Sequence, residues 1–260
     1  MGYIFSFDDA VTYEKWSDKP KNRYVTELEG CLMLSMLGPM IGERVIDIGC
    51  GTGAAILPFL EKRLSVTGLD PSQYMLDIAS NNLGNRVDLH KGFAEDLPFS
   101  DNSFNHACLV KTLEFAENPE MAIREACRVA KNKVFIGFLN RHSFRGTGLR
   151  VKRIFTNTIY NHARFFSIWE LKHTIRTILG DVPMSWRTVC QFSSGRGKIC
   201  NKIECSQLIQ KCPFGAFAGM TITLVPRFRT RPLELPCTPD PSTNGTVPGL
   251  ARTKELKIQD

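Results

Sequence analysis

A glycine-rich segment with an acidic residue on each side has the residue types and spacing that bind nucleosides. It reads Val45-Ile-Asp-Ile-Gly-Cys-Gly-Thr-Gly53, and Asp70 lies 21 residues after its first glycine, Gly49. Glycines let the backbone approach a ligand closely, and a carboxylate at this distance can accept hydrogen bonds from ribose hydroxyls. The segment therefore predicts a binding site for a cofactor that contains a nucleoside.

The charge beside the glycines indicates which nucleoside. The pattern is Gly-x-Gly-x-Gly, not the Gly-x-Gly-x-x-Gly of dinucleotide sites, and Asp47 stands two residues before Gly49. A carboxylate repels the pyrophosphate of a dinucleotide, whereas it attracts the cationic sulfonium and ammonium groups of S-adenosylmethionine (SAM). SAM is therefore the predicted cofactor. A dinucleotide and a glycine turn that serves only packing are the alternatives.

Alternating strands and helices are expected around this segment. Apolar positions at helical spacing predict a helix over 24–37 that stops at Gly38-Pro39. A capping-box pattern, Ser167 with Glu170, predicts a helix over 166–179. Further strands are expected at 44–48, 65–70, 87–90, 105–110, 133–138, 186–192 and 221–225, and further helices at 54–62, 72–83 and 119–130.

This alternation predicts a Rossmann-like α/β fold: a seven-stranded, mostly parallel sheet with helices on both faces, a helical N-terminal cover and an inserted lid. The cover is expected in residues 1–40 and the catalytic domain in 41–225. Interleaved basic and aromatic residues mark the lid at 141–166. The proline-rich segment 226–260 is expected to be a disordered tail.

Composition excludes several classes of protein. The 260 residues are 43% hydrophobic and 23% charged, which fits a globular chain and excludes a collagen-like or disordered one. The first residues carry acids and no basic segment before an apolar one, so they do not resemble a secretion signal, and a cytoplasmic protein is expected. The charge is uneven: residues 1–140 hold 14 Lys and Arg against 19 Asp and Glu, whereas residues 141–260 hold 19 against 7.

Nine cysteines are expected to be reduced thiols in that compartment. Four of them, Cys190, Cys200, Cys205 and Cys212, fall within 23 residues, but only the gap from Cys200 to Cys205 has the Cys-x₂₋₄-Cys form, and zinc sites are typically built from two such pairs. No metal is therefore predicted.

Four segments together resemble the class I SAM-dependent methyltransferases, and within them the branch that contains quinone-biosynthesis C-methyltransferases. They are VIDIGCGTG at 45–53, GLDPSQYMLDIA at 68–79, GFAEDLPFSDNSFN at 92–105 and LEFAENPEMAIREACRV at 113–129. The resemblance covers about residues 10–225 and is more specific for fold and cofactor than for substrate.

The resemblance implies a role for individual residues. The glycine segment would bind the methionine part of SAM, Asp70 the ribose, and the turn at Phe93-Ala94 the adenine. Relatives commonly have Asp or Asn where this chain has Phe93, so the adenine is expected to be held by backbone and stacking. The implied cofactor-binding residues are Tyr13, Asp47, Gly49, Cys50, Gly51, Asp70, Pro71, Phe93, Ala94 and Lys111.

Methyl transfer by displacement at the sulfonium methyl is the implied reaction. Because SAM is already activated, the protein mainly aligns the nucleophile with the methyl group and excludes water, with an optional base. The candidates for a catalytic base are Glu114 and His142. An exposed acid at a helix start and a surface histidine are the alternatives for these two residues.

The resemblance implies a small-molecule acceptor, anionic or lipophilic. The basic second half of the chain can attract an anionic substrate, nucleic acid or lipid headgroups, and its charge does not choose between them. An RNA methyltransferase is the main alternative, although residues 111–115, Lys-Thr-Leu-Glu-Phe, lack the Asn/Asp-Pro-Pro-aromatic signature of enzymes that methylate nucleobase amino groups. Docking of segment 149–160 on an anionic membrane surface and a SAM-binding sensor without catalysis are further alternatives.

Overall fold

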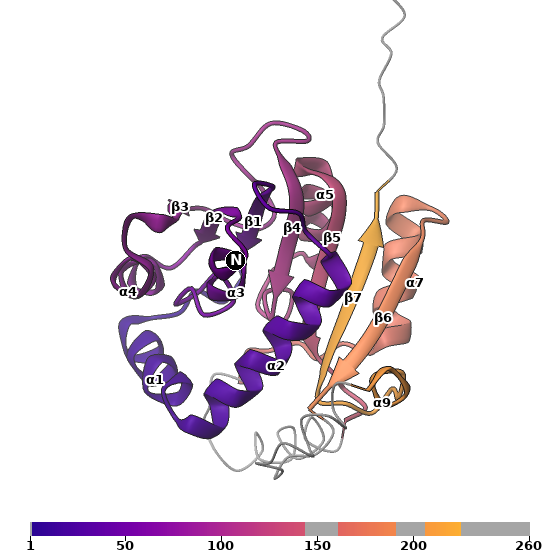
Figure 1. Ribbon diagram of the computed structural model, residues 1–260, viewed down its shortest axis with the longest axis horizontal. Helices are drawn as coiled ribbons and strands as arrows, with labels where there is room; N and C mark the ends of the chain where they lie inside the picture. Colours follow the sequence, from indigo (N-terminus) through magenta and orange to yellow (C-terminus); the bar gives the residue numbers. More distant parts are fainter. Residues whose placement is uncertain (1, 144–160, 191–205, 225–260) are drawn as a thin grey trace, which may run out of the picture. The chain divides into compact units, whose positions relative to one another are not determined.

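Seven strands form one sheet in the computed structural model, which describes residues 2–143, 161–190 and 206–224 (Figure 1). Their order is β3-β2-β1-β4-β5-β7-β6. β1 to β5 run parallel, and β7 runs antiparallel to both β5 and β6. The predicted seven-stranded, mostly parallel sheet is confirmed. The strands are β1 (Arg44–Ile48), β2 (Ser65–Asp70), β3 (Asp88–Lys91), β4 (Phe104–Val110), β5 (Ala130–Leu139), β6 (Met184–Val189) and β7 (Phe217–Thr223).

The chain divides into two units, Met1–Pro226 and Arg227–Asp260, and all described residues belong to the first. Most of the predicted lid lies outside the described residues, as do Cys200, Cys205 and the predicted tail. The domain boundaries given above stay predictions.

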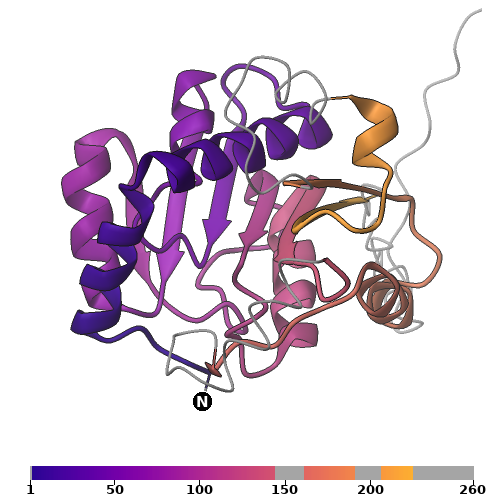
Figure 2. The same ribbon diagram turned by 90° about the horizontal axis from the view of Figure 1, so that it is seen from below.

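Helices cover both faces of the sheet. α2 packs on β5, β6 and β7, and α3 and α4 pack on β2, all on one face, whereas α5 and α7 cover the other (Figure 2). No helix among the described residues is both long and apolar enough to cross a membrane. The helices are α1 (Phe7–Ser17), α2 (Pro20–Leu37), α3 (Leu57–Glu61), α4 (Gln73–Leu83), η1 (Gly84–Arg86), α5 (Pro119–Val129), α7 (Ile168–Leu179) and α9 (Gln207–Gln210).

The alternation of side chains along β1 positions the first acid of the glycine segment. Ile46 and Ile48 belong to the apolar cluster under α5 and α7, whereas Val45 belongs to the cluster under α2, α3 and α4. Because successive side chains of a strand point to opposite faces, Asp47 shares the face of Val45. The sequence thus places a carboxylate on the α2 side, one residue before β1 ends.

The N-terminal region contains one helix more than the sequence analysis predicts. α2 begins at Pro20, four residues earlier than expected, and α1 precedes it. The start of α1 has a capping box, in which the Ser6 hydroxyl accepts from the Asp9 N–H and the Asp9 carboxylate accepts from the Ser6 N–H. This Ser-x-x-Asp spacing was a signal in the sequence that could have located α1.

The predicted bounds of several other elements were wrong, and β5 begins at Ala130, three residues earlier than predicted. α3 is shorter than the predicted helix because residues 51–56 form turns. β6 ends before Cys190, which has a left-handed backbone with φ +63°. β7 begins at Phe217, four residues before the predicted start at Thr221. The prediction missed these residues because Gly219 has a low strand propensity, whereas in the structure its missing side chain makes room for the ring of Phe135.

Phe135 offers a test of this packing because its ring is fully buried against the glycines of β5 and β7. We expect Phe135→Ala to destabilise the protein by about 3–5 kcal/mol, through lost burial and a residual cavity. Urea unfolding measures the change. Phe214→Ala is the control, because Phe214 is 51% exposed, and it should cost less than about 1 kcal/mol. Equal losses in both variants would contradict the packing described here.

Candidate active site

The chain leaves β1 toward β2 and β3 on one side and returns to β4 on the other, so the direction of winding reverses between β1 and β4. In open α/β sheets ligands bind outside the carboxyl ends of the strands at such a point. A cavity lies there. Its walls include the glycine segment, the ends of β2, β4 and β5, the beginning of β7 and one face of α2.

A second, smaller cavity adjoins the first, and Asp70 and Phe115 line both. Pro71, Phe93 and Ala94, three of the residues predicted for the nucleoside, line only the second cavity. Phe93 is 40% exposed and Ala94 is buried. The structure therefore brings the predicted adenine-binding turn to one end of the site and the predicted methionine-binding segment to the other.

The glycine segment bends sharply so that its backbone forms the cavity wall. Gly49 and Gly51 have φ values of +74° and +52°, in the left-handed region that side chains disfavour. A Cβ at Gly49 would collide with the side chain of Thr112, whereas a Cβ at Gly51 would meet no atom within 4 Å. Gly49 is thus required by its close packing against Thr112, whereas Gly51 is required only by its left-handed backbone, which borders open space.

Asp70 holds the loop with both carboxylate oxygens. Oδ2 accepts from the Gly51 N–H at 2.9 Å, and Oδ1 accepts from the Ser72 N–H at 2.9 Å. Burial raises the pKa of Asp70, and these two backbone hydrogen bonds oppose the shift. Because each carboxylate oxygen can accept more than one hydrogen bond, Asp70 can organise the loop and still receive ribose hydroxyls.

Asp47 is the least satisfied polar group of the site. Its side chain is 1% exposed, and neither carboxylate oxygen has a hydrogen-bond partner. Burial, with a smaller contribution from the charge of Asp70, raises its pKa from the ordinary 3.8 to about 7. A buried carboxylate without partners is costly, and a cationic group that fills the adjacent cavity would remove the cost. The ammonium group of SAM fits this requirement.

Lys111 follows β4 and also has a left-handed backbone, with φ +57°. Its Nζ donates to Glu29 Oε2 of α2 at 2.6 Å and lies 5.7 Å from the centre of the Phe217 ring. Tyr13, predicted to cover the cofactor, lines the same cavity, and burial raises its pKa. Sequence reasoning missed Glu29, because a glutamate inside a helix carries no signal of this contact.

Cys50 also lines the larger cavity, where burial raises the pKa of its thiol well above the ordinary value. A protonated, buried thiol is a poor nucleophile. Cys50 therefore contributes to the wall rather than to nucleophilic chemistry. Among the described residues, no three His, Cys, Asp or Glu side chains are grouped so that they could hold a metal ion.

Glu114, one of the two candidate bases, is 1% exposed rather than an exposed acid at a helix start. Its Oε1 accepts from the Leu139 N–H at 2.8 Å, and Oε2 has no partner. Burial raises its pKa to about 7, although the Leu139 N–H and Lys111 act in the opposite direction. Glu114 lines neither of the two cavities; it lines a separate pocket together with His162 and Arg164.

His142, the other candidate base, is exposed and lies outside both cavities. Its ring packs edge-to-face on Trp169, with 5.7 Å between the ring centres. Its backbone N–H donates to Asn140 Oδ1. The structure thus does not bring His142 to the residues predicted for the cofactor.

Residues 2–6, here named the N-terminal strap, cross the site as an extended segment, whereas the predicted N-terminal cover was helical. The Tyr3 N–H donates to the Phe115 carbonyl at 3.0 Å, and the Ser72 hydroxyl donates to the Phe5 carbonyl at 2.7 Å. The Tyr3 ring stacks on His162 with 4.2 Å between ring centres. Phe5 lines both cavities, so the strap forms part of the wall of each.

With this geometry established, known proteins were compared with the chain. Residues 46–137 match a family model described as a methyltransferase domain. An uncharacterized protein of Methanocaldococcus jannaschii is 36% identical over 171 residues, which cover 65% of this chain and 77% of that protein. The demethylmenaquinone methyltransferase of Renibacterium salmoninarum is 34% identical over 100 residues, 38% of this chain and 42% of that enzyme.

Solved structures agree with these matches. A SAM-dependent methyltransferase of Thermotoga maritima, described as a possible histamine N-methyltransferase, is 28% identical with a TM-score of 0.63. The alignment covers 84% of this chain and 97% of the Thermotoga chain. The similarity therefore extends beyond the glycine segment to nearly the whole of that fold.

Removal of the charge of Asp47 should increase the stability of the ligand-free protein and decrease its affinity for the cofactor product. Its folded pKa of about 7 exceeds the ordinary 3.8, so stability is complete below that ordinary value and is lost as pH rises through 7. We expect Asp47→Asn to stabilise the ligand-free protein at pH 8 by more than about 1 kcal/mol and to weaken binding of S-adenosylhomocysteine (SAH) at least about tenfold. Urea unfolding and calorimetry measure the two effects.

The pH dependence of binding gives a second readout. Because Asp47 must lose its proton to pair with an ammonium group, SAH affinity of the original protein should fall below pH 7, by up to about tenfold per pH unit. Asp47→Asn should lack this dependence, and Asp88→Asn, on the exposed start of β3, should retain it. SAH binding with the same pH profile in all three proteins would disprove the role of Asp47.

Proposed function

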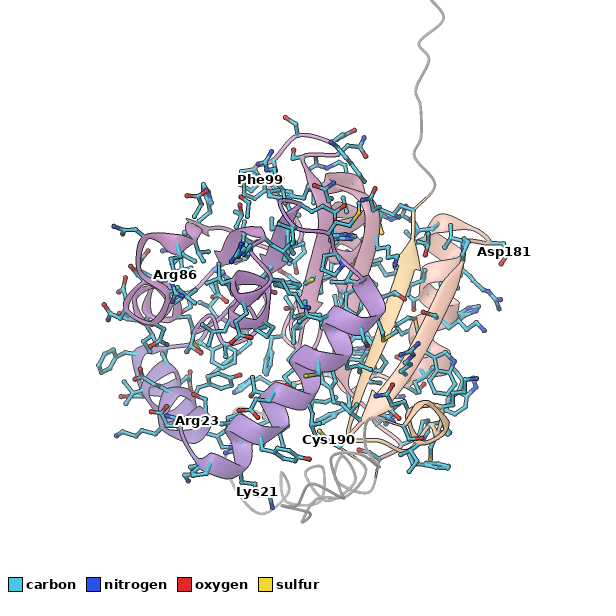
Figure 3. All side chains as sticks on the ribbon, in the orientation of Figure 1. Lys21, Arg23, Arg86, Phe99, Asp181 and Cys190 are labelled. Carbon is cyan, nitrogen blue, oxygen red and sulfur yellow. The ribbon has the colours of Figure 1, made fainter. Side chains whose placement is uncertain are left out.

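Because the chain belongs to the SAM-dependent methyltransferases, we propose that it transfers a methyl group from SAM to a small-molecule acceptor. The single observation that supports a small acceptor is that the larger cavity is also lined by residues that were not predicted to bind the cofactor. Among them are Val25 and Glu29 of α2, Leu139 at the end of β5 and Cys190. Figure 3 labels Cys190 at the end of β6.

The two cavities suit the two ends of SAM. Asp47 would bind the ammonium group and Asp70 the ribose hydroxyls, because these are the buried carboxylates on the walls at the reversal between β1 and β4. Phe93 and Ala94 would flank the adenine in the smaller cavity. Phe93 has no side-chain acceptor for the exocyclic amine, so this contact would be made by its ring and by backbone groups.

Bound SAM supplies a methyl group on a cationic sulfur, which a nucleophile can displace directly. The chain's task is to hold the acceptor in line with that methyl group and to keep water away. Phe5, Phe115 and Phe217 supply apolar walls for this exclusion. Lys111 and Glu29 are the polar pair that faces the acceptor half of the cavity and would orient a polar group there.

The names of the relatives indicate different acceptors. One relative is named for demethylmenaquinone and another for histamine, a ring-bearing quinone derivative and an amine. RNA remains the competing acceptor class, because residues 141–260 are strongly basic. The proposal is that a small molecule, not RNA, enters the cavity of this chain.

Two measurements test the proposed function. Calorimetry with SAM and SAH should show binding of both. Mass spectrometry should then show a product with one added methyl group after SAM and the purified protein are incubated with the small-molecule fraction of a cell extract. Methylation of the RNA fraction alone, with binding that weakens steeply as salt is added, would replace the proposal with the RNA alternative. Binding without any product in either fraction would favour a sensor.

Asp70 gives a prediction for the ribose. We expect Asp70→Ala to weaken SAH binding by about 1–3 kcal/mol, from the loss of charge-assisted hydrogen bonds. Calorimetry measures the loss, and circular dichroism checks that the variant is folded, since Asp70 also anchors Gly51 and Ser72. An unchanged affinity in a folded variant would refute the ribose assignment.

A further inference from the structure

The walls of the larger cavity carry more negative than positive charge. Among the described residues that line it, the acidic ones are Glu29, Asp47 and Asp70, and the basic one is Lys111. Lys111 is already paired with Glu29 at 2.6 Å. Asp47, buried and without a hydrogen-bond partner, faces this same space. The charge of the cavity is therefore opposite in sign to that of the whole chain, which is +7.

SAM compensates only part of this charge. Its sulfonium and ammonium groups are cationic and its carboxylate is anionic, so it brings one net positive charge to walls with two net negative charges. Uncompensated charge in a space shielded from water is costly. A cationic second ligand would complete the compensation, whereas an anionic one would increase the excess.

Aromatic side chains also line the larger cavity. Tyr13 and Trp16 of α1 lie 5.6 Å apart between ring centres, and Phe217 lies at the start of β7. Aromatic faces attract cations, most strongly where water is excluded. The ammonium group of Lys111 above the Phe217 ring is one instance of this attraction in the cavity itself.

We propose that the methyl acceptor is an amine, held as its cation between Glu29 and these aromatic rings. The inference rests on the proposed function and narrows its substrate class. In the reaction the ammonium form first gives a proton to the Glu29 carboxylate. The nitrogen lone pair then forms the N–C bond as the C–S bond breaks, and that bonding pair stays on sulfur.

Three probes of similar size and different charge test this assignment. They are 2-phenylethylamine, 2-phenylethanol and 3-phenylpropanoate, each titrated by calorimetry into protein saturated with SAH. We expect the amine to bind at least about tenfold more tightly than the alcohol, and the carboxylate to bind most weakly. Failure of SAH itself to bind would refute the proposed function, whereas failure of the amine preference in SAH-bound protein refutes only the present inference.

Variants of the Lys111–Glu29 ion pair make the test more specific, because the two variants should change the affinity for the amine in opposite directions. Glu29→Gln should weaken amine binding about tenfold and leave the alcohol unchanged, since the amide keeps the shape without the charge. Lys111→Met should strengthen amine binding, because a like charge is removed, and weaken carboxylate binding. Glu61→Gln, an exposed acid at the end of α3, is the matched control and should change nothing.

SAH affinity is measured for every variant, so that a general loss of structure is recognised. The inference is overturned if the alcohol or carboxylate binds as tightly as the amine, if none of the three probes binds, or if Lys111→Met weakens amine binding. Turnover gives an independent readout, because incubation of the amine with SAM should yield its N-methyl derivative by mass spectrometry. A methylated alcohol with an unmethylated amine would also overturn it.

Discussion

One carboxylate, that of Asp47, constrains the rest of the site. The alternation of β1 turns it away from the cluster under α5 and α7 and toward the α2 face, where water is largely excluded. The nearest backbone donors of the glycine segment serve other acceptors: the Gly51 N–H goes to Asp70, and the Gly49 and Cys50 N–H groups go to the Leu69 carbonyl. The fold thus leaves a buried carboxylate that is neutralised by a proton below about pH 7 and that a cationic ligand can compensate above it.

Net charge describes the outside of a protein, whereas recognition depends on the few charges that face the ligand. The basic excess of residues 141–260 suggested an anionic acceptor, but the described walls of the cavity are mainly acidic. The cavity-forming acids come from α2, β1 and β2, far apart in sequence. A count of charged residues along the sequence cannot show which of them come together in the folded protein.

Local sequence patterns predicted the parts of the fold that depend on local physics. Ser72, the first residue of the predicted helix 72–83, caps α4, and the strand that ends at Asp70 was predicted with both bounds. The glycine segment and its two acids could be located from spacing alone. Contacts between distant elements could not be predicted in this way. The Lys111–Glu29 pair joins residues that are 82 positions apart in the sequence. The start of β7 was predicted too late because Gly219 fits a strand only where the ring of Phe135 packs against it. Burial also excludes the alternative of an exposed acid for Glu114, because exposure depends on tertiary packing that the sequence does not show.

The N-terminal strap is the first part of the chain, yet it contacts a site that is built mainly from residues much later in the sequence. Because Phe5 lines both cavities, any molecule that fills them contacts the strap. The free energy by which a bound ligand stabilises the ordered strap must then equal the free energy by which the ordered strap stabilises the bound ligand. The strap is joined to the rest of the site by hydrogen bonds at Tyr3 and Phe5 and by the rings of these two residues, which pack against Phe115. A ligand that displaced residues 2–6 would break these contacts.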